Sequence, residues 1–145
     1  METKIELHPL GVMKGKLGEP VTVGGGPKGT RVIIDVPSVE FTGERFNAVL
    51  ATNDAADWAT FSDDGKIAAL DVRMTLKTDD GALIYVEYQG RMEVEKGLLA
   101  TAPTFQTGSE KYSWLNSIQA VAAGAVDNES GLLTYTIYEA RPVPA

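Results

Sequence analysis

The sequence predicts an all-β protein, an antiparallel closed β-barrel of about 8–10 strands. Two observations lead to this prediction. Runs rich in β-branched and aromatic residues recur at short intervals, separated by glycine, proline, asparagine and aspartate, which is the spacing of a sandwich or barrel. No window carries a long helical period, so a parallel sheet with crossover helices is not expected.

The strand signals fall into strong and weak runs. The strong ones are Ile5–Met13, Arg31–Phe41, Ile67–Thr78, Ala82–Tyr88, Trp114–Val121 and Leu132–Glu139. The weak ones are Val21–Val23, Phe46–Leu50, Trp58–Phe61 and Glu93–Leu99, and Ala120–Val126 has the composition of a helical turn. No repeat or linker divides the chain, so residues 1–145 are expected to form a single domain.

One hairpin can be placed in register. Asp79-Asp80-Gly81 has the form of a three-residue loop with glycine in the left-handed position, so Thr78 should face Ala82. One face then pairs Leu76 with Ile84, Met74 with Val86 and Val72 with Tyr88. The other pairs Thr75 with Tyr85, Arg73 with Glu87 and Asp71 with Gln89. The coincidence of apolar residues on both strands supports this register, because a slip of one residue would scramble both faces.

The register leaves open which face points inward. With the apolar face inside, Asp71, Arg73 and Glu87 would form a solvated lattice of ion pairs worth about 0–1 kcal/mol each. With the polar face inside, as in barrels that hold ligands, these groups and Tyr85 would converge on a bound molecule. The pattern alone favours the apolar face inside.

The composition excludes several classes of chemistry and of binding partner. The chain has no cysteine, which excludes disulfides and thiolate chemistry. Acidic residues outnumber basic ones by 20 to 13, and the net charge of −7 argues against nucleic acid and anionic membranes as partners. Without a secretory signal or membrane span in the sequence, a cytoplasmic location is expected. The expected partner is a small molecule, and edge strands left outside the barrel keep a homodimer open.

Several motif matches do not fit their structural context. Gly24–Gly29 matches a dinucleotide fingerprint by letter, but a β-run follows it where a helix is required, so it is interpreted as a flexible connection. The Asp-Asp-Gly triplets at Asp63 and Asp79 do not continue into a calcium-loop pattern and are interpreted as turns. His8 is the only histidine, so no metal site is predicted.

Because the chain has no cysteine and only one histidine, any catalysis is expected to use carboxylates, aromatic residues and amides. Asp57 beside Trp58 is the most suggestive pair, since a carboxylate held against an indole in an apolar cavity would have a raised pKa and could carry a proton near neutral pH. The alternative is an aspartate at the start of a strand that carries a core tryptophan. Tyr112, Trp114 and Asn116 alternate along an expected strand and would form an aromatic wall with an amide, or plain core.

Two long segments resemble the family known as domain of unknown function 3237. They are Gly43–Val86, with Asp57-Trp58, Asp64-Gly65 and Leu70-Asp71-Val72-Arg73-Met74, and Pro103–Asn116, with Pro103-Thr104-Phe105-Gln106-Thr107-Gly108. The resemblance implies a lipocalin-like or allene-oxide-cyclase-like barrel with a central pocket and no cofactor. The residues that match recurrent family positions are Arg31, Asp57, Trp58, Asp71, Arg73, Asp80, Tyr85, Trp114 and Asn116. Thr52-Asn53-Asp54-Ala55 and a short Gly90–Thr101 segment depart from the family pattern.

Because the polar hairpin face matches a family signature, the resemblance moves the expectation toward Asp71, Arg73 and Tyr85 facing the lumen. The leading hypothesis is a cofactor-independent lyase, isomerase or cyclase that moves a proton on a carbonyl-bearing or phenolic molecule. Asp57 or Asp71 would be the acid or base, Arg73 would hold an enolate or carboxylate, and Tyr85 and Asn116 would donate to developing charge. Arg31, Trp58, Tyr112 and Trp114 would contact the substrate. The alternative is a non-catalytic binding protein for an apolar or aromatic ligand.

Overall fold

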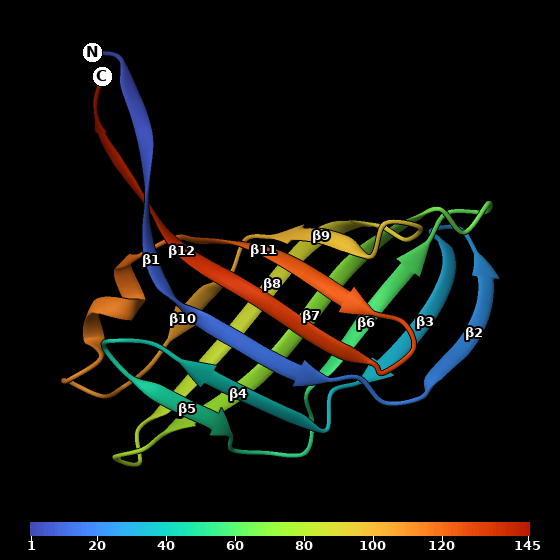
Figure 1. Ribbon diagram of the computed structural model, residues 1–145, viewed down its shortest axis with the longest axis horizontal. Coiled ribbons are helices and arrows are strands. Elements are labelled where there is room, and N and C mark those ends of the chain that lie inside the picture. The colour runs from blue at the N-terminus through green and yellow to red at the C-terminus, as the bar shows by residue number, and fades with distance from the viewer.

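The computed structural model describes all 145 residues, and the chain forms twelve strands and one 3₁₀ helix joined by turns and loops (Figure 1). The elements are β1 (Thr3–Lys16), β2 (Pro20–Gly26), β3 (Gly29–Asp35), β4 (Ser38–Thr42), β5 (Asn47–Leu50), β6 (Ala56–Phe61), β7 (Ile67–Thr78), β8 (Leu83–Glu93), β9 (Leu98–Thr101), β10 (Thr104–Gln106), η1 (Ser113–Ser117), β11 (Ala120–Asp127) and β12 (Leu132–Pro144). No helix is long or apolar enough to cross a bilayer.

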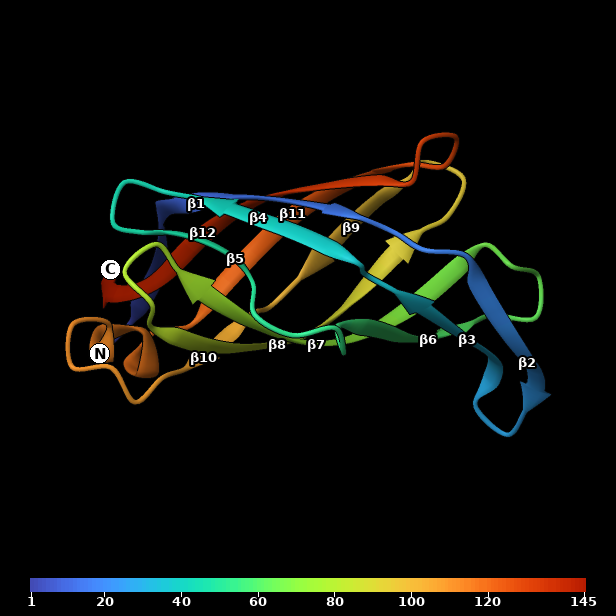
Figure 2. The ribbon, with the colours of Figure 1, turned by 90° about the horizontal axis from the view of Figure 1, so that it is seen from below.

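Eight strand positions close into an antiparallel barrel, which confirms the predicted fold class. Around the ring the order is β7, β8, β9 with β10, β11, β12, β1, β4 and β5, and β5 pairs back onto β7. The short strands β9 and β10 share one position because each pairs with a different half of β8. Seen from below, β1, β4, β11 and β12 form one wall, and β6, β7 and β8 form the other (Figure 2).

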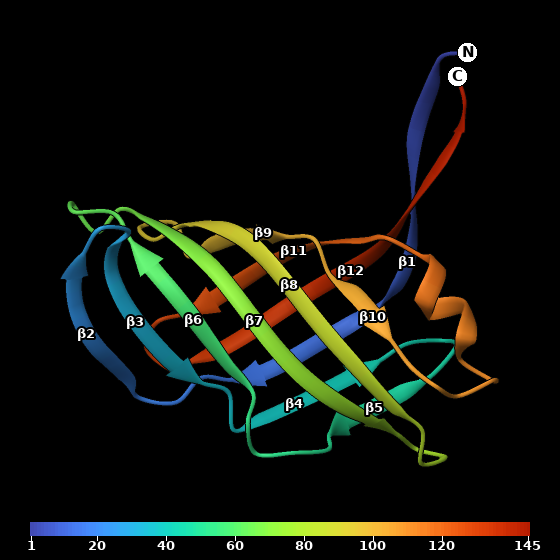
Figure 3. The ribbon, with the colours of Figure 1, turned by 180° about the vertical axis from the view of Figure 1, so that it is seen from behind.

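The edge of β7 is shared between two strands. Its C-terminal half pairs with β5, which closes the ring, and its N-terminal half pairs with β6. Strands β3 and β2 continue the sheet from β6 and end in a free edge at β2. This branch extends away from the ring at the end of the barrel opposite η1 (Figure 3). At that end no strand pairing closes the ring, and the interior is covered by the branch of β6, β3 and β2 and by turns.

The predicted hairpin register is confirmed pair by pair, from Lys77 opposite Leu83 to Asp71 opposite Gln89. Thr78 also donates its backbone N–H to the carbonyl of Ala82 at 2.9 Å. The apolar face lies inside, where it joins a core cluster of 25 buried residues that includes Val72, Met74 and Leu76.

Other sequence predictions need correction. The run Arg31–Phe41 is two strands, because the chain turns at Val36 and Pro37. Glu93–Leu99 contains the turn that joins β8 to β9. The run Trp114–Val121 begins as η1, and Ala120–Val126, with the composition of a helical turn, is strand β11. The Gly24–Gly29 segment is the tip of the β2–β3 hairpin, whose register shifts between Thr22 and Gly24.

Candidate functional site

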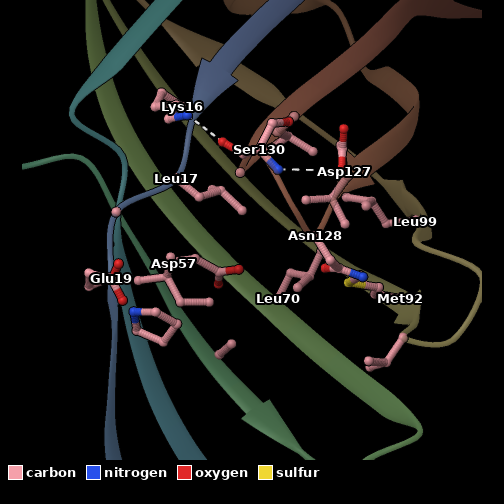
Figure 4. Close-up of a pocket in the computed structure, with 18 of the residues that line it drawn as sticks. Lys16, Leu17, Glu19, Asp57, Leu70, Met92, Leu99, Asp127, Asn128 and Ser130 are labelled. Atoms are coloured by element: carbon pink, nitrogen blue, oxygen red, sulfur yellow. Dashed lines mark hydrogen bonds between the residues drawn. The ribbon is translucent and has the colours of Figure 1, made fainter.

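A cavity of about 570 Å³ opens at the branched end of the barrel (Figure 4). Its inner wall is apolar and comes from β3, β6, β7, β8, β9 and β12, with Ile34, Ala59, Leu70, Met92, Leu99 and Leu133. The β1–β2 connection and the β11–β12 turn form its rim. The volume lies in the range of small-molecule pockets.

Asp57 is the one predicted site residue that lines this cavity. The residue is 8% exposed, and its side chain points into the space enclosed by the strands (Figure 4). The β6–β7 pairing is interrupted at Trp58 and Ala59, and the backbone N–H of Asp71 donates instead to Asp57 Oδ1 at 3.0 Å. One carboxylate oxygen is thus fixed by the neighbouring strand.

Burial raises the pKa of Asp57 to about 6. Loss of hydration is the largest cause; the hydrogen bond from Asp71 opposes it, and the nearby Asp71 carboxylate adds to it. Such a group is about 90% ionised at pH 7 and can both accept and return a proton near neutrality. Asp57 is thus a buried carboxylate that borders the apolar wall of the cavity, and its role as an acid or base stays a prediction.

Two phenols share the interior with Asp57. Tyr135 lines the cavity, and Tyr88 packs edge-on against it with ring centroids 5.4 Å apart. Burial raises the pKa of Tyr135 well above its usual value, with the Tyr88 phenol and the Asp57 charge acting in the same direction. Tyr135 is therefore a neutral phenol near neutral pH and can donate a hydrogen bond.

Polar and charged side chains gather at the rim. Lys16 donates a hydrogen bond to the carbonyl of Ser130, which joins the two rim segments. Asp127 accepts from the backbone N–H of Glu129 at 3.0 Å and of Ser130 at 3.4 Å, and these bonds hold its pKa below the usual value. Figure 4 shows Lys16, Ser130 and Asp127 on one side of the opening and Glu19 on another.

The prediction that Asp71, Arg73 and Tyr85 face the lumen is wrong. Along β7 and β8 these residues alternate with buried apolar ones, and none lines the cavity. Arg73 is exposed, and the Tyr85 hydroxyl donates to Glu87 at 3.1 Å on the outer face. Burying each large apolar side chain contributes about 1.5–3 kcal/mol, whereas burying the ionic face would cost several kcal/mol per charge.

Trp58 and Arg31 also lie outside. Trp58 is 50% exposed because it follows Asp57 on a strand, where consecutive side chains point to opposite faces. The predicted contact between its indole and the Asp57 carboxylate is therefore wrong. Arg31 donates from Nη1 to the carbonyl of Trp58 at 2.7 Å, so it braces the outer face of the interrupted strand.

The predicted aromatic wall does not form on a strand. Tyr112 precedes η1, is buried against Phe46 and donates its hydroxyl to Asp80 at 2.9 and 3.0 Å. Trp114 lies under the guanidinium of Arg45, 3.2 Å from the ring centroid. Asn116 bonds both the N–H and the carbonyl of Thr107. All three residues belong to η1 or precede it directly. This helix lies at the end of the barrel opposite the branch (Figure 1), and none of the three residues lines the cavity.

Sequence reasoning missed Tyr135 and the whole rim. The signal for Tyr135 was present, since Leu133, Tyr135 and Ile137 alternate on one face of β12. Nothing in the sequence marks the segments that form the rim, because they meet only after the barrel closes. No three side chains of the metal-binding types come together anywhere in the structure.

Comparison with known proteins gives a consistent result. The model of the family "Protein of unknown function (DUF3237)" matches residues 5–140. The UPF0311 protein blr7842 of Bradyrhizobium diazoefficiens is 32% identical over 126 residues, which cover 76% of this chain and 81% of that protein.

Solved structures share the architecture. A β-barrel-like protein from Acinetobacter baumannii AYE superposes with a TM-score of 0.84 at 29% identity, covering 95% of this chain and 97% of the other. An enzyme from Penicillium herquei superposes with a TM-score of 0.73 at 22% identity, covering 97% and 98%, a likeness of fold. The chain therefore belongs to the DUF3237 family of small β-barrel proteins.

Proposed function

We propose that this protein is a cofactor-independent lyase, isomerase or cyclase in which Asp57 moves a proton on a carbonyl-bearing or phenolic molecule bound in the lumen. The observation that carries the proposal is the position of Asp57. It is the only buried carboxylate of the chain, its pKa is raised to about 6, and it borders a cavity of about 570 Å³. A perturbed carboxylate in a cleft is typical of acid–base catalysis.

The roles follow from the geometry. The ionised Asp57 would accept a proton from a C–H next to a carbonyl or from a phenolic O–H. The free oxygen of its carboxylate is available for this, because Asp71 holds the other. The neutral phenol of Tyr135 would donate to the oxygen on which negative charge develops. The protonated Asp57 would then return the proton to a different atom, which completes an isomerisation, elimination or ring closure.

A protein of the same fold from Penicillium herquei is an enzyme. At 22% identity this likeness concerns the fold, so it supports the capacity of such a barrel for catalysis and not a particular reaction.

The test is proton exchange on a bicyclic ketone. We expect the protein to accelerate deuterium uptake at the activated CH₂ of 2-tetralone in D₂O, followed by NMR. Asp57→Asn should abolish this acceleration, and Tyr135→Phe should reduce it on the order of 100-fold. The matched controls Glu40→Gln and Tyr138→Phe change groups outside the cavity and should leave the acceleration intact. No acceleration by the wild type, or equal rates with and without the Asp57 carboxylate, would contradict the proposal.

One observation favours the alternative of a non-catalytic binding protein. The cationic group predicted to hold an enolate, Arg73, lies on the outer face, so no cation faces Asp57 across the lumen. A carrier would bind 2-tetralone and return it without deuterium, whereas an enzyme returns it labelled.

A further inference from the structure

Most of the charged side chains that line the cavity are acidic. Among the residues that line it, four carry carboxylates and one carries an ammonium group: Glu19, Asp57, Asp127, Glu129 and Lys16. A ligand that enters passes the rim before it reaches Asp57, so it meets negative charge at both depths (Figure 4).

The single ammonium group is already engaged. Lys16 donates to the Ser130 carbonyl and holds the β11–β12 turn against the end of β1. Asp127 caps its own turn through two backbone N–H groups, which keeps it ionised. Glu19 and Glu129 are exposed and accept no hydrogen bond from the protein. The rim therefore offers an incoming anion no free cationic partner.

Deeper in the cavity Asp57 is the only charged group. The side chains around it are aliphatic, and the guanidinium groups of the two strands that flank β6 point to the outer face. These are Arg31 on β3 and Arg73 on β7. Repulsion between two charges is strong where water is excluded, and nothing here offsets it.

Resting on the function proposed above, we infer the charge of the substrate: the cavity takes an uncharged, largely apolar molecule of about two or three fused rings and excludes carboxylates, phosphates and sulfonates. The lining offers no aromatic cage for a quaternary ammonium, because Phe61 and Tyr135 are its only aromatic side chains. The enolate or phenolate charge would then arise only in the reaction, from the proton that Asp57 removes.

The experiment uses a fluorescent reporter and two competitors that differ in charge. N-phenyl-1-naphthylamine is neutral and fluoresces in apolar surroundings. 2-Acetylnaphthalene and 2-naphthalenesulfonate have the same ring system, and the sulfonate stays ionised at every pH used. At pH 8 we expect 2-acetylnaphthalene to displace the reporter at a concentration at least about 10-fold lower than the sulfonate.

Variants and pH identify the charge responsible. Asp57→Asn should reduce the difference between the concentrations at which the two competitors displace the reporter. Glu40→Gln, which removes an exposed carboxylate on β4 away from the cavity, should leave this difference unchanged. Lowering the pH from 8 to 5 should also reduce the difference between the displacing concentrations of the ketone and the sulfonate in the wild type. The same change of pH should have a much smaller effect in Asp57→Asn. The titratable groups that face Asp57 are Tyr88, Tyr135 and Asp71. Burial raises the pKa of both phenols, so neither phenol changes charge in this range, whereas the pKa of Asp57, about 6, lies within it. His8 is not part of the lining.

The outcomes separate the two proposals. The exclusion of anions is overturned if the reporter binds but the sulfonate displaces it as well as the ketone does. It is also overturned if the two competitors differ in displacing concentration as much in Asp57→Asn as in the wild type. In both cases proton transfer by Asp57 stands. If neither the reporter nor the ketone binds, the lumen is closed to ligands and both proposals fail.

Discussion

At the scale of single residues, Asp57 is a group whose burial opposes folding. Its pKa is about 6 in the folded protein against a usual value of 3.8, because the carboxylate loses hydration. The folded state thus binds this proton more tightly than the unfolded chain, so the destabilisation caused by Asp57 should diminish as the pH falls from above 6 toward 4. The difference between the two pKa values corresponds to a penalty of about 3 kcal/mol at pH 8.

Replacing this carboxylate should therefore stabilise the fold. We expect Asp57→Asn, which keeps an acceptor for the Asp71 N–H, to raise the free energy of unfolding in urea at pH 8 by up to about 3 kcal/mol. At pH 5 the gain should be smaller by about 1 kcal/mol or more, since the wild-type carboxyl is then protonated. A gain of the same size at both pH values would show that Asp57 is not the buried ionisable group described above.

Packing around Tyr135 depends on a neighbouring glycine. A Cβ at Gly124 would lie 2.6 Å from the Tyr135 ring. We expect Gly124→Ala to displace this ring and lower the free energy of unfolding by about 1–3 kcal/mol, with weaker binding of N-phenyl-1-naphthylamine. Gly25→Ala is the matched control, because a Cβ at Gly25 meets nothing within 4 Å. Equal stability of the two variants would mean that the ring does not occupy the space above Gly124.

At the scale of elements, the β7–β8 hairpin was predictable because two local signals agree. The Asp79-Asp80-Gly81 loop sets the register, and Gly81 does adopt a positive φ of 89°. Alternation on both strands then defines the two faces. The choice of inner face was decided by apolar burial, which the pattern alone indicated. The family signature on Asp71 and Arg73 pointed the other way, because recurrence of a residue does not report the side of the sheet on which it lies.

The segment around η1 could not be predicted in the same way. Tyr112, Trp114 and Asn116 have the spacing of a strand face, but their side chains are used in long-range contacts. Asn116 takes the place of a strand partner for Thr107, and Tyr112 bonds Asp80 in the distant β7–β8 turn. Such contacts are invisible in a local window of sequence.

The bond between Tyr112 and Asp80 should stabilise the closed end of the barrel without affecting the cavity. We expect Tyr112→Phe to lower Tm by roughly a few degrees, because a charge-assisted hydrogen bond is lost while the ring stays packed on Phe46. Calorimetry measures this shift, and displacement of N-phenyl-1-naphthylamine should be unchanged. A loss of ligand binding with no change in Tm would place Tyr112 in the site instead.

At the scale of the whole molecule, the barrel has one end closed by η1 and one end left open by the branch at β7. The sequence predicted the barrel from the number and spacing of its strands. The open end was not predictable, because it depends on β5 and β6 sharing one edge of β7, which is set by pairings distant in sequence. The homodimer and the cytoplasmic location stay predictions.

The most direct measurement is a titration of the side-chain carboxyl groups by ¹³C NMR, with the Asp57 resonance identified by its absence in Asp57→Asn. We expect this resonance to titrate near pH 6, apart from the other aspartates, and to shift when N-phenyl-1-naphthylamine is added. A midpoint near 4 that is unmoved by the ligand would mean that Asp57 is hydrated and outside any binding cavity, and would contradict the central claim.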